Sequence, residues 1–273
     1  MPGWELRLIA TYAPALDGSL LSQLETIEQE KDVGLIELPS RNAVHSRVLG
    51  DLFMIKRRAD TRIVISGDCS FLHRIAHRWT SRSLTIEGDV GAGLGIQMRG
   101  GQLDVYGNAM DDLGCQMRGG VIQVKGNVGN FLGGPMPGRR SGMSGGRVIV
   151  FGNAGHHAGY RMRRGTVIIN GNCGVAVASD MVAGTVVVRG TVGDHVAAGM
   201  KRGTLVVDKR TFLQPIRFSQ PRLERLSVMR LLESDLQNDV PEIARAMRFP
   251  ISRSLGDLSA GGRGEVWGIE HPS

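Results

Sequence analysis

The sequence predicts an all-β protein, a parallel β-helix whose coils are about 19 residues long. Glycine makes up 39 of the 273 residues, about twice its ordinary share, while the aromatic residues are only 7 Phe, 3 Tyr and 3 Trp. Short apolar segments that end in Gly recur at steps of 21, 19, 19, 26, 19 and 19 residues. A Met ten residues after most of these glycines, and a further Gly three residues after each Met, keep the same register once an insertion of seven residues is subtracted. Three columns in one register indicate an internal repeat.

The pattern of apolar residues within each repeat indicates a half-buried strand. Apolar and often β-branched residues stand two and four positions before each Gly, as Leu84 and Ile86 do before Gly88. This alternation has the period of a strand, and equivalent strands stacked in parallel bury one continuous apolar column. Eight coils at about 4.8 Å per step predict a stack about 34 Å long. The predicted coils end at Gly67, Gly88, Gly107, Gly126, Gly152, Gly171 and Gly190, with Leu205 and Val207 in the last one.

The remaining columns predict which residues form the corners of the coils and which fill their core. Gly at a fixed corner allows a positive φ or a close approach between coils, and the Asp or Asn that follows it is expected to secure that corner by hydrogen bonds. The Met column is interpreted as an adaptable core filler rather than a metal site. The outward strand positions are polar early and apolar later, from Ile149 onward. We therefore expect the later coils to be covered by the chain's own C-terminal segment or by another subunit.

Both ends of the chain lack the repeat, which divides the sequence into residues 1–60, 61–209 and 210–273. The first segment predicts strands at Trp4–Ala10 and Val33–Leu38 and an amphipathic helix over Ser19–Lys31, with Ser22 and Glu25 spaced as a capping box. We expect it to cover the exposed edge of the first coil.

The last segment is expected to be helical or extended and to contact partner subunits. Leu223–Leu232 has helical apolar spacing, and Pro241 is expected to open a short helix. Gly256–Ser273 is rich in Gly and polar residues and is expected to pack on a partner rather than to fold alone. Within the repeat region, Phe71–Trp79 departs from the coil pattern and is expected to be helical.

Composition predicts a cytoplasmic protein that does not enter a membrane. Three Cys without a C-x-x-C pair indicate a reduced, intracellular chain. No run of 18 apolar residues and no secretory signal are present. The formal net charge of +7 points to anionic partners without identifying them.

No catalytic or metal-binding constellation is predicted. The phosphate-loop and nucleophile-elbow patterns are missing, and His73 and His77 lack the adjacent Glu of a metalloprotease helix. His157 and His195 share a column but lie two coils apart, about 9.6 Å, too far for one metal ion. The three Cys form no disulfide framework; Cys69 and Cys173, for example, share a column five coil steps apart, about 24 Å.

Basic residues gather at the Met-x-x-Gly corners, where stacking would align them into a stripe. A solvated corner and a binding surface for a polyanion or acidic partner both remain open. Nucleic acid is disfavoured, because no aromatic residues interleave with the stripe for base stacking. The candidate contacts are Arg139 and Arg140 in the insertion and Arg163, Arg164, Lys201 and Arg202 at the corners, with Arg99 and Arg118 on the same column.

The repeated G-N-[VA]-G and M-R-G-G segments, and GGPMPGRRSGMSGG within the insertion, resemble a known family over about residues 60–208. The chain resembles the C subunits of bacterial formyltransferase/hydrolase complexes and of formylmethanofuran dehydrogenases, and is similar to the C-terminal domain of the glutamate synthase large subunit. The resemblance implies a right-handed parallel β-helix that serves as a structural subunit of a hetero-oligomer.

The resemblance to the bacterial complex implies that a formyl group passes from formyl-tetrahydromethanopterin to a methanofuran-type carrier and is released as formate. The transferase and hydrolase sites and the metals are then held by other subunits, and this chain alone binds no cofactor. In the alternative, a formylmethanofuran dehydrogenase, the complex carries a tungsten or molybdenum pterin and iron–sulfur clusters. A third expectation is that the basic stripe binds the acidic glutamate tail of the furan carrier.

Overall fold

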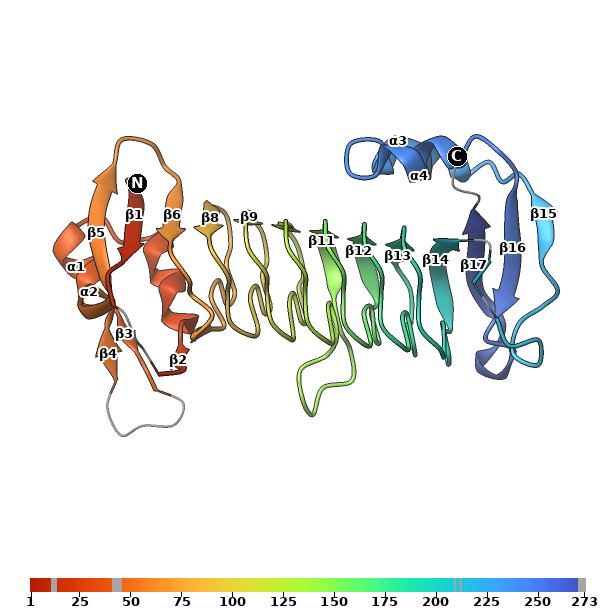
Figure 1. Cartoon of the computed structure of the whole chain (residues 1–273), viewed down its shortest axis with the longest axis horizontal. Coiled ribbons are helices and arrows are strands. Elements are labelled where there is room, and N and C mark those ends of the chain that lie inside the picture. The colour runs from red at the N-terminus through yellow and green to blue at the C-terminus, as the bar shows by residue number, and fades with distance from the viewer. Residues whose placement is uncertain (11–13, 41–45, 209, 212, 270–273) are drawn as a thin grey trace.

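A computed structural model describes residues 1–10, 14–40, 46–208, 210–211 and 213–269. Among these residues, most strands join one 13-stranded sheet in the order β15-β16-β17-β14-β13-β12-β11-β10-β9-β8-β6-β1-β5. Figure 1 shows the middle of the chain as a row of stacked coils, each of which adds one strand to this sheet. The predicted all-β class is confirmed.

The repeat strands pair in parallel and in the predicted register. Leu84 lies beside Leu103, Leu103 beside Ile122, and the column continues to Leu205. A second line of single bridges runs through each coil from Cys69 to Val192. The strands are β6 (Ile63–Ser66), β8 (Ser83–Glu87), β9 (Gln102–Val105), β10 (Val121–Val124), β11 (Ser144–Val150), β12 (Arg164–Ile169), β13 (Thr185–Val188) and β14 (Arg202–Asp208).

The residues at the corners connect each coil to the next through hydrogen bonds and close backbone packing. From Asp89 to Asn172, the side-chain oxygen of each Asp or Asn in this column accepts a hydrogen bond from the backbone N–H of its equivalent in the next coil, as Asn108 Oδ1 does from Asn127 N at 2.8 Å. Gly126 is required here because a Cβ would lie 2.6 Å from the Gly107 carbonyl oxygen of the preceding coil. The methionines fill the core as predicted: Met98, Met117, Met143, Met162, Met181 and Met200 are all fully buried.

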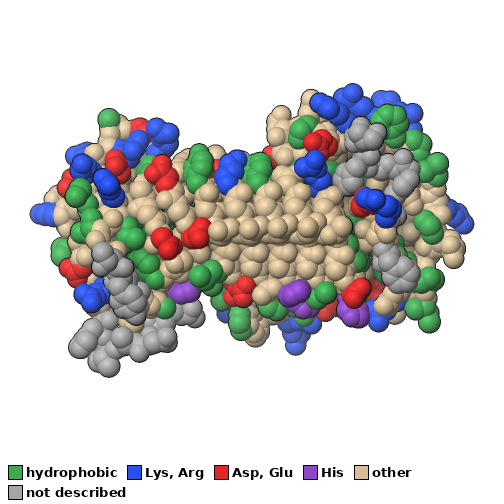
Figure 2. All heavy atoms as spheres, in the orientation of Figure 1, with side chains coloured by type: hydrophobic (Ala, Val, Ile, Leu, Met, Phe, Trp, Pro, Cys, Tyr) green, Lys and Arg blue, Asp and Glu red, His purple; other side chains and the backbone are tan. Residues whose placement is uncertain are grey.

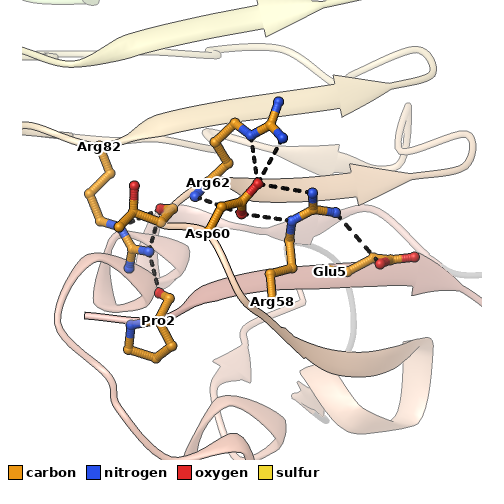
Figure 3. A network of polar contacts seen from close by, with 7 residues as sticks. Pro2, Glu5, Arg58, Asp60, Arg62 and Arg82 are labelled. Atoms are coloured by element: carbon orange, nitrogen blue, oxygen red, sulfur yellow. Dashed lines mark hydrogen bonds and ion pairs between the residues drawn. The ribbon is translucent and has the colours of Figure 1, made fainter.

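The N-terminal segment extends the sheet beyond the first coil. Strand β1 (Gly3–Leu8) pairs in parallel with β6, and β5 (Phe53–Arg58) pairs antiparallel with β1 and forms the edge. Arg82 donates to the carbonyl oxygens of Pro2 and Thr61, and Asp60 accepts from Arg58 and Arg62 (Figure 3). The smaller elements are β2 (Leu16–Asp17), η1 (Ser19–Glu25), α1 (Glu30–Gly34), β3 (Glu37–Leu38), β4 (Arg47–Val48) and α2 (Leu49–Leu52).

The single helix predicted over Ser19–Lys31 is wrong. A 3-10 helix, η1, is followed by the separate short helix α1, so the predicted strand at Val33–Leu38 is reduced to β3. Glu25 does not form a capping box with Ser22. Its buried carboxylate instead accepts hydrogen bonds from successive backbone N–H groups of 80–82, which ties the N-terminal segment to the corner of the coil.

The helix predicted over Phe71–Trp79 is also wrong. This stretch holds β7 (Leu72–His73), which pairs with β2, and then a turn. Arg74, Ala76 and Arg78 have φ values of +59°, +57° and +59°, which a helix excludes. Their backbone follows the equivalent corner of the next coil, since Arg74 N donates to Ala92 O at 2.8 Å. The stretch is therefore an ordinary coil corner made without glycine.

The later coils are covered by the chain's own C-terminal segment, one of the two alternatives that the sequence left open. Ile149, Ile168, Val187 and Val206 form a second buried cluster with residues of α3 (Met229–Leu236) and α4 (Pro241–Ala246). Figure 1 shows these two helices lying over β11 to β14. Arg147 forms ion pairs with two carboxylates of the segment, those of 235 and 239.

The end of the chain folds as strand, contrary to the expectation for Gly256–Ser273. Strand β17 (Arg263–Ile269) pairs in parallel with β14, and β16 (Ile251–Gly256) pairs antiparallel with β17. Residues 270–273 of that expectation lie outside the described residues. Pro241 opens α4 as predicted, whereas Leu223–Leu232 splits between β15 (Arg222–Glu224) and α3. A 3-10 turn, η2 (Leu258–Ala260), joins β16 to β17.

Candidate functional site

The corner that carries the predicted basic residues is built by the Met column. Each Met is buried and the residue after it turns outward. From Arg118 onward, the N–H of that residue donates to the carbonyl oxygen of the Met one coil earlier, and Arg99 N donates to Trp79 O instead. Arg118 N thus donates to Met98 O at 2.7 Å, and Lys201 N to Met181 O at 2.8 Å. Gly at Met plus three has a positive φ in every coil, from +80° to +113°. The repeat therefore fixes where each basic side chain leaves the backbone.

The structure brings the predicted corner residues into one line. Arg99 and Arg118 belong to adjacent coils, about 4.8 Å apart along the stack, and the later basic pairs are separated by two steps, about 9.6 Å. Ser144, and Val182 with Ala183, interrupt the line. Strand β17 adds Arg263, which lies beside Arg202. We call this line the basic ridge, and all seven of its members are exposed: Arg99, Arg118, Arg163, Arg164, Lys201, Arg202 and Arg263.

The insertion forms a loop that leaves the stack beside Ser144, in the gap of the ridge. Its base is fixed by Met143 N, which donates to Gly133 O at 2.7 Å, and by Gly142 N, which donates to Arg161 O at 2.9 Å. The loop projects from the row of coils (Figure 1), and its residues Arg139 and Arg140 are exposed. The structure therefore places them on a separate protrusion next to the ridge rather than in its line.

The charges of the ridge are not neutralised by the chain itself. Within the described part of the chain, no ridge residue forms an ion pair, and neither do Arg139 and Arg140. Arginines elsewhere behave differently: Arg147, Arg189 and Arg253 are all paired with carboxylates. Like charges stacked at these spacings raise the local potential, which attracts an extended anion or an acidic surface.

The cysteines are not candidate nucleophiles. Cys69, Cys115 and Cys173 are free and buried. Burial raises the pKa of Cys69 and of Cys173 to about 12, and it raises that of Cys115 further. Cys69 and Cys173 lie five bridges apart in one column, in agreement with their predicted separation. Thiols held protonated in this way are poor nucleophiles and poor metal ligands.

One of the histidines considered for metal binding, His73, holds the neighbouring coil. His73 Nδ1 accepts a hydrogen bond from Ala92 N at 2.9 Å; His73 ends strand β7 and His77 lies on the following turn, so neither is on a helix. Among the described residues, no group of three or more His, Cys, Asp or Glu is placed to hold a metal ion. None of the described helices is long and apolar enough to cross a membrane.

An aromatic cluster beside the insertion was missed by sequence reasoning. The rings of Phe131 and His157 stack with their centroids 5.0 Å apart, and Tyr160 meets both edge-on. Both stacked residues have a positive φ, +59° and +60°. They occupy equivalent corners of adjacent coils, so the shared column was the signal that could have found them. The cluster supports the base of the insertion loop.

Comparison with known proteins relates the chain to one family and to a solved structure. The sequence matches the GXGXG motif family over residues 63–234. The structure is similar to a chain of the formyltransferase/hydrolase complex FhcABCD from Methylorubrum extorquens, solved by X-ray crystallography in complex with methylofuran. That chain is 32% identical, the alignment covers 98% of this chain and 100% of that one, and the TM-score is 0.90. A comparison with curated proteins found no match.

Proposed function

We propose, from the premise that this chain belongs to the GXGXG motif family, that it is a non-catalytic structural subunit of a formyltransferase/hydrolase complex. The observation that carries the proposal is the end-to-end similarity to a chain of FhcABCD, at 32% identity and a TM-score of 0.90. The similarity covers 98% of this chain and therefore extends beyond the repeat into its ends. The partners are the other subunits of the complex, in a cytoplasmic hetero-oligomer.

The complex would move a formyl group from formyl-tetrahydromethanopterin to a methanofuran-type carrier and release formate. The solved relative was crystallised with methylofuran, which supports a furan carrier here. In this proposal the reacting groups and the metals belong to partner subunits. The polar groups of this chain support that division, because its Asn, Asp and His side chains accept hydrogen bonds from neighbouring coils and its thiols are buried.

The same proposal covers the handedness of the coils and the division of the chain into three segments. The coils wind as a right-handed parallel β-helix over residues 61–209, because a crossover between parallel strands of one sheet is right-handed in almost all proteins. Residues 1–60 form the N-terminal cap, and residues 210–273 form the segment that meets partner subunits.

A second role is supported by the unpaired charges of the basic ridge. The ridge, with Arg139 and Arg140, would hold the acidic tail of the furan carrier while its formyl-bearing end visits the sites of other subunits. A line of cations spaced about 5–10 Å apart suits a flexible polyanion better than a compact ligand.

Two experiments test these roles. Co-purification of the native complex should return this chain with formyltransferase and hydrolase subunits, and the isolated chain should catalyse neither reaction. Tungsten or molybdenum in the purified complex would instead favour a formylmethanofuran dehydrogenase. For the ridge, reversing Arg163, Arg164 and Arg202 to Glu should raise the KM for the carrier several-fold at low salt and less at high salt. An unchanged KM would exclude the ridge as the carrier site.

A further inference from the structure

The C-terminal segment has a second apolar face, which is turned to solvent. One face of the segment buries Met229, Leu236 and Ile243 over the coils. Away from that face, Leu231 is 72% exposed and Phe249 is 67% exposed. Figure 2 shows hydrophobic and basic side chains together over this end of the molecule, at the upper right. Exposed apolar side chains gathered among charged ones are typical of a protein interaction surface.

A groove opens on this surface where α3 begins and α4 ends. Its volume is about 530 Å³. Leu226, Met229 and Met247 provide its apolar floor, and the latter two are buried. Unbranched Met side chains adapt their shape to an inserted group. We call this the C-terminal groove; its lining is Arg225, Leu226, Ser227, Met229, Arg230, Glu233, Met247 and Arg248.

The rim of the groove carries an uncompensated positive charge. Glu233 is the single acidic residue of the lining, and it is already paired with Arg248. Arg225 and Arg230 are exposed and form no ion pair with any residue that the structure describes. The other carboxylates of the described part of the segment are engaged elsewhere: those of 235, 239 and 242 pair with arginines of the coils, those of 224 and 265 pair with Arg253, and that of 257 pairs with Arg217.

We propose that the C-terminal groove docks an acidic segment of another subunit, which inserts an apolar side chain between Met229 and Met247 and pairs its carboxylates with Arg225 and Arg230. The inference rests on the proposed function and names the surface through which that assembly forms. Guanidinium groups bind carboxylates through paired hydrogen bonds, and arginines beside an apolar pocket are typical of the energetic centre of an interface. A second copy of this chain fits poorly, because it would bring two positive rims together.

A cross-linking experiment identifies the occupant directly. A photoreactive amino acid replaces Ser227, which lines the groove, is exposed and forms no side-chain hydrogen bond in the described structure; the complex is then purified intact and irradiated. The expected product joins position 227 to an acidic peptide of another subunit. Products with a second copy of this chain, with a neutral or basic peptide, or confined to this chain would overturn the inference.

Charge reversal tests the chemistry of the rim. The double variant Arg225→Glu/Arg230→Glu should bind the remaining subunits about 30-fold or more weakly than the wild type does. The matched control Lys56→Glu/Arg57→Glu makes the same charge change on exposed positions of β5, at the other end of the sheet, and should bind as the wild type does. Circular dichroism and thermal unfolding of both variants establish that the chain is folded.

The outcomes separate the inference from the proposed function. If the wild type assembles and the groove variant assembles with the same affinity, the docking site is refuted while the proposed function stands. If the wild type assembles with no formyltransferase/hydrolase subunit, both are refuted. Equal weakening by the groove variant and by the control would show a general effect of charge and would also refute the docking site.

Discussion

Glu25 is expected to hold the N-terminal segment to the coils through one carboxylate. Three consecutive backbone N–H groups, those of Thr80, Ser81 and Arg82, donate to it at 3.0, 2.8 and 3.2 Å. The residue is 7% exposed, so few water molecules can replace the carboxylate. Replacement by Ala leaves three donors poorly satisfied. At about 1 kcal/mol for each, the local free energy of opening falls by about 3 kcal/mol.

Hydrogen exchange at the amides of residues 80–82 measures this loss where it occurs. About 3 kcal/mol corresponds to a fall of about two orders of magnitude in protection. Glu25→Gln retains one acceptor oxygen and should cause a smaller loss. Glu28→Ala is the matched control, because Glu28 is exposed and has no hydrogen bond or ion pair in the described structure. A change of less than about threefold at these amides in Glu25→Ala, or an equal loss in the control, would refute this role.

Three further outcomes are expected. Arg147→Ala removes the ion pairs that hold α3 over the coils and should speed proteolysis within α3, with a loss of about 1–2 kcal/mol; unchanged cleavage would show that apolar contacts suffice. Burial acts to raise the pKa of Asp257, but hydrogen bonds from Ser259 and the charge of Arg217 outweigh it, so the net pKa lies below 3.8. The stability that Asp257 adds is therefore present above about pH 4 and lost as pH falls through the lowered pKa, so the Tm difference between wild type and Asp257→Asn should shrink below pH 4. The thiol of Cys173 should resist alkylation at pH 8 in the folded protein and react in urea, and fast labelling of the native chain would contradict its burial.

The repeat made the coils predictable, because each column reports a single physical requirement. Gly126 stands where a Cβ would clash with the preceding coil, and Met117 fills the core. Asn108 accepts a hydrogen bond from the equivalent corner of the next coil. These requirements recur in each coil, so seven corner glycines and six methionines reinforce one another. The basic ridge followed from the same register, since a buried Met directs its neighbour outward.

The predictions that were wrong concern residues that have no equivalents of the same type in other coils. Arg74, Ala76 and Arg78 take a left-handed conformation that the sequence usually gives to Gly, and their spacing imitates a helix. Strand β17 has Gly264 opposite the corner Gly203, but Gly261 stands where the other coils have Met, so the repeat could not be extended to Arg263. The pairing of β17 with β14 also spans more than fifty residues of sequence. Glu25 was placed in a local capping motif because its partners, residues 80–82, are distant in sequence.

The composition of the purified native complex tests the central claim most directly. This chain, tagged at its natural level of expression, is isolated, and the mass and identity of each co-purifying subunit are determined together with formyl transfer and formate release. The scaffold role predicts one assembly that contains formyltransferase and hydrolase subunits, with activity that disappears when this chain is isolated from them. A chain that purifies without those subunits, or that transfers or hydrolyses the formyl group alone, would contradict it.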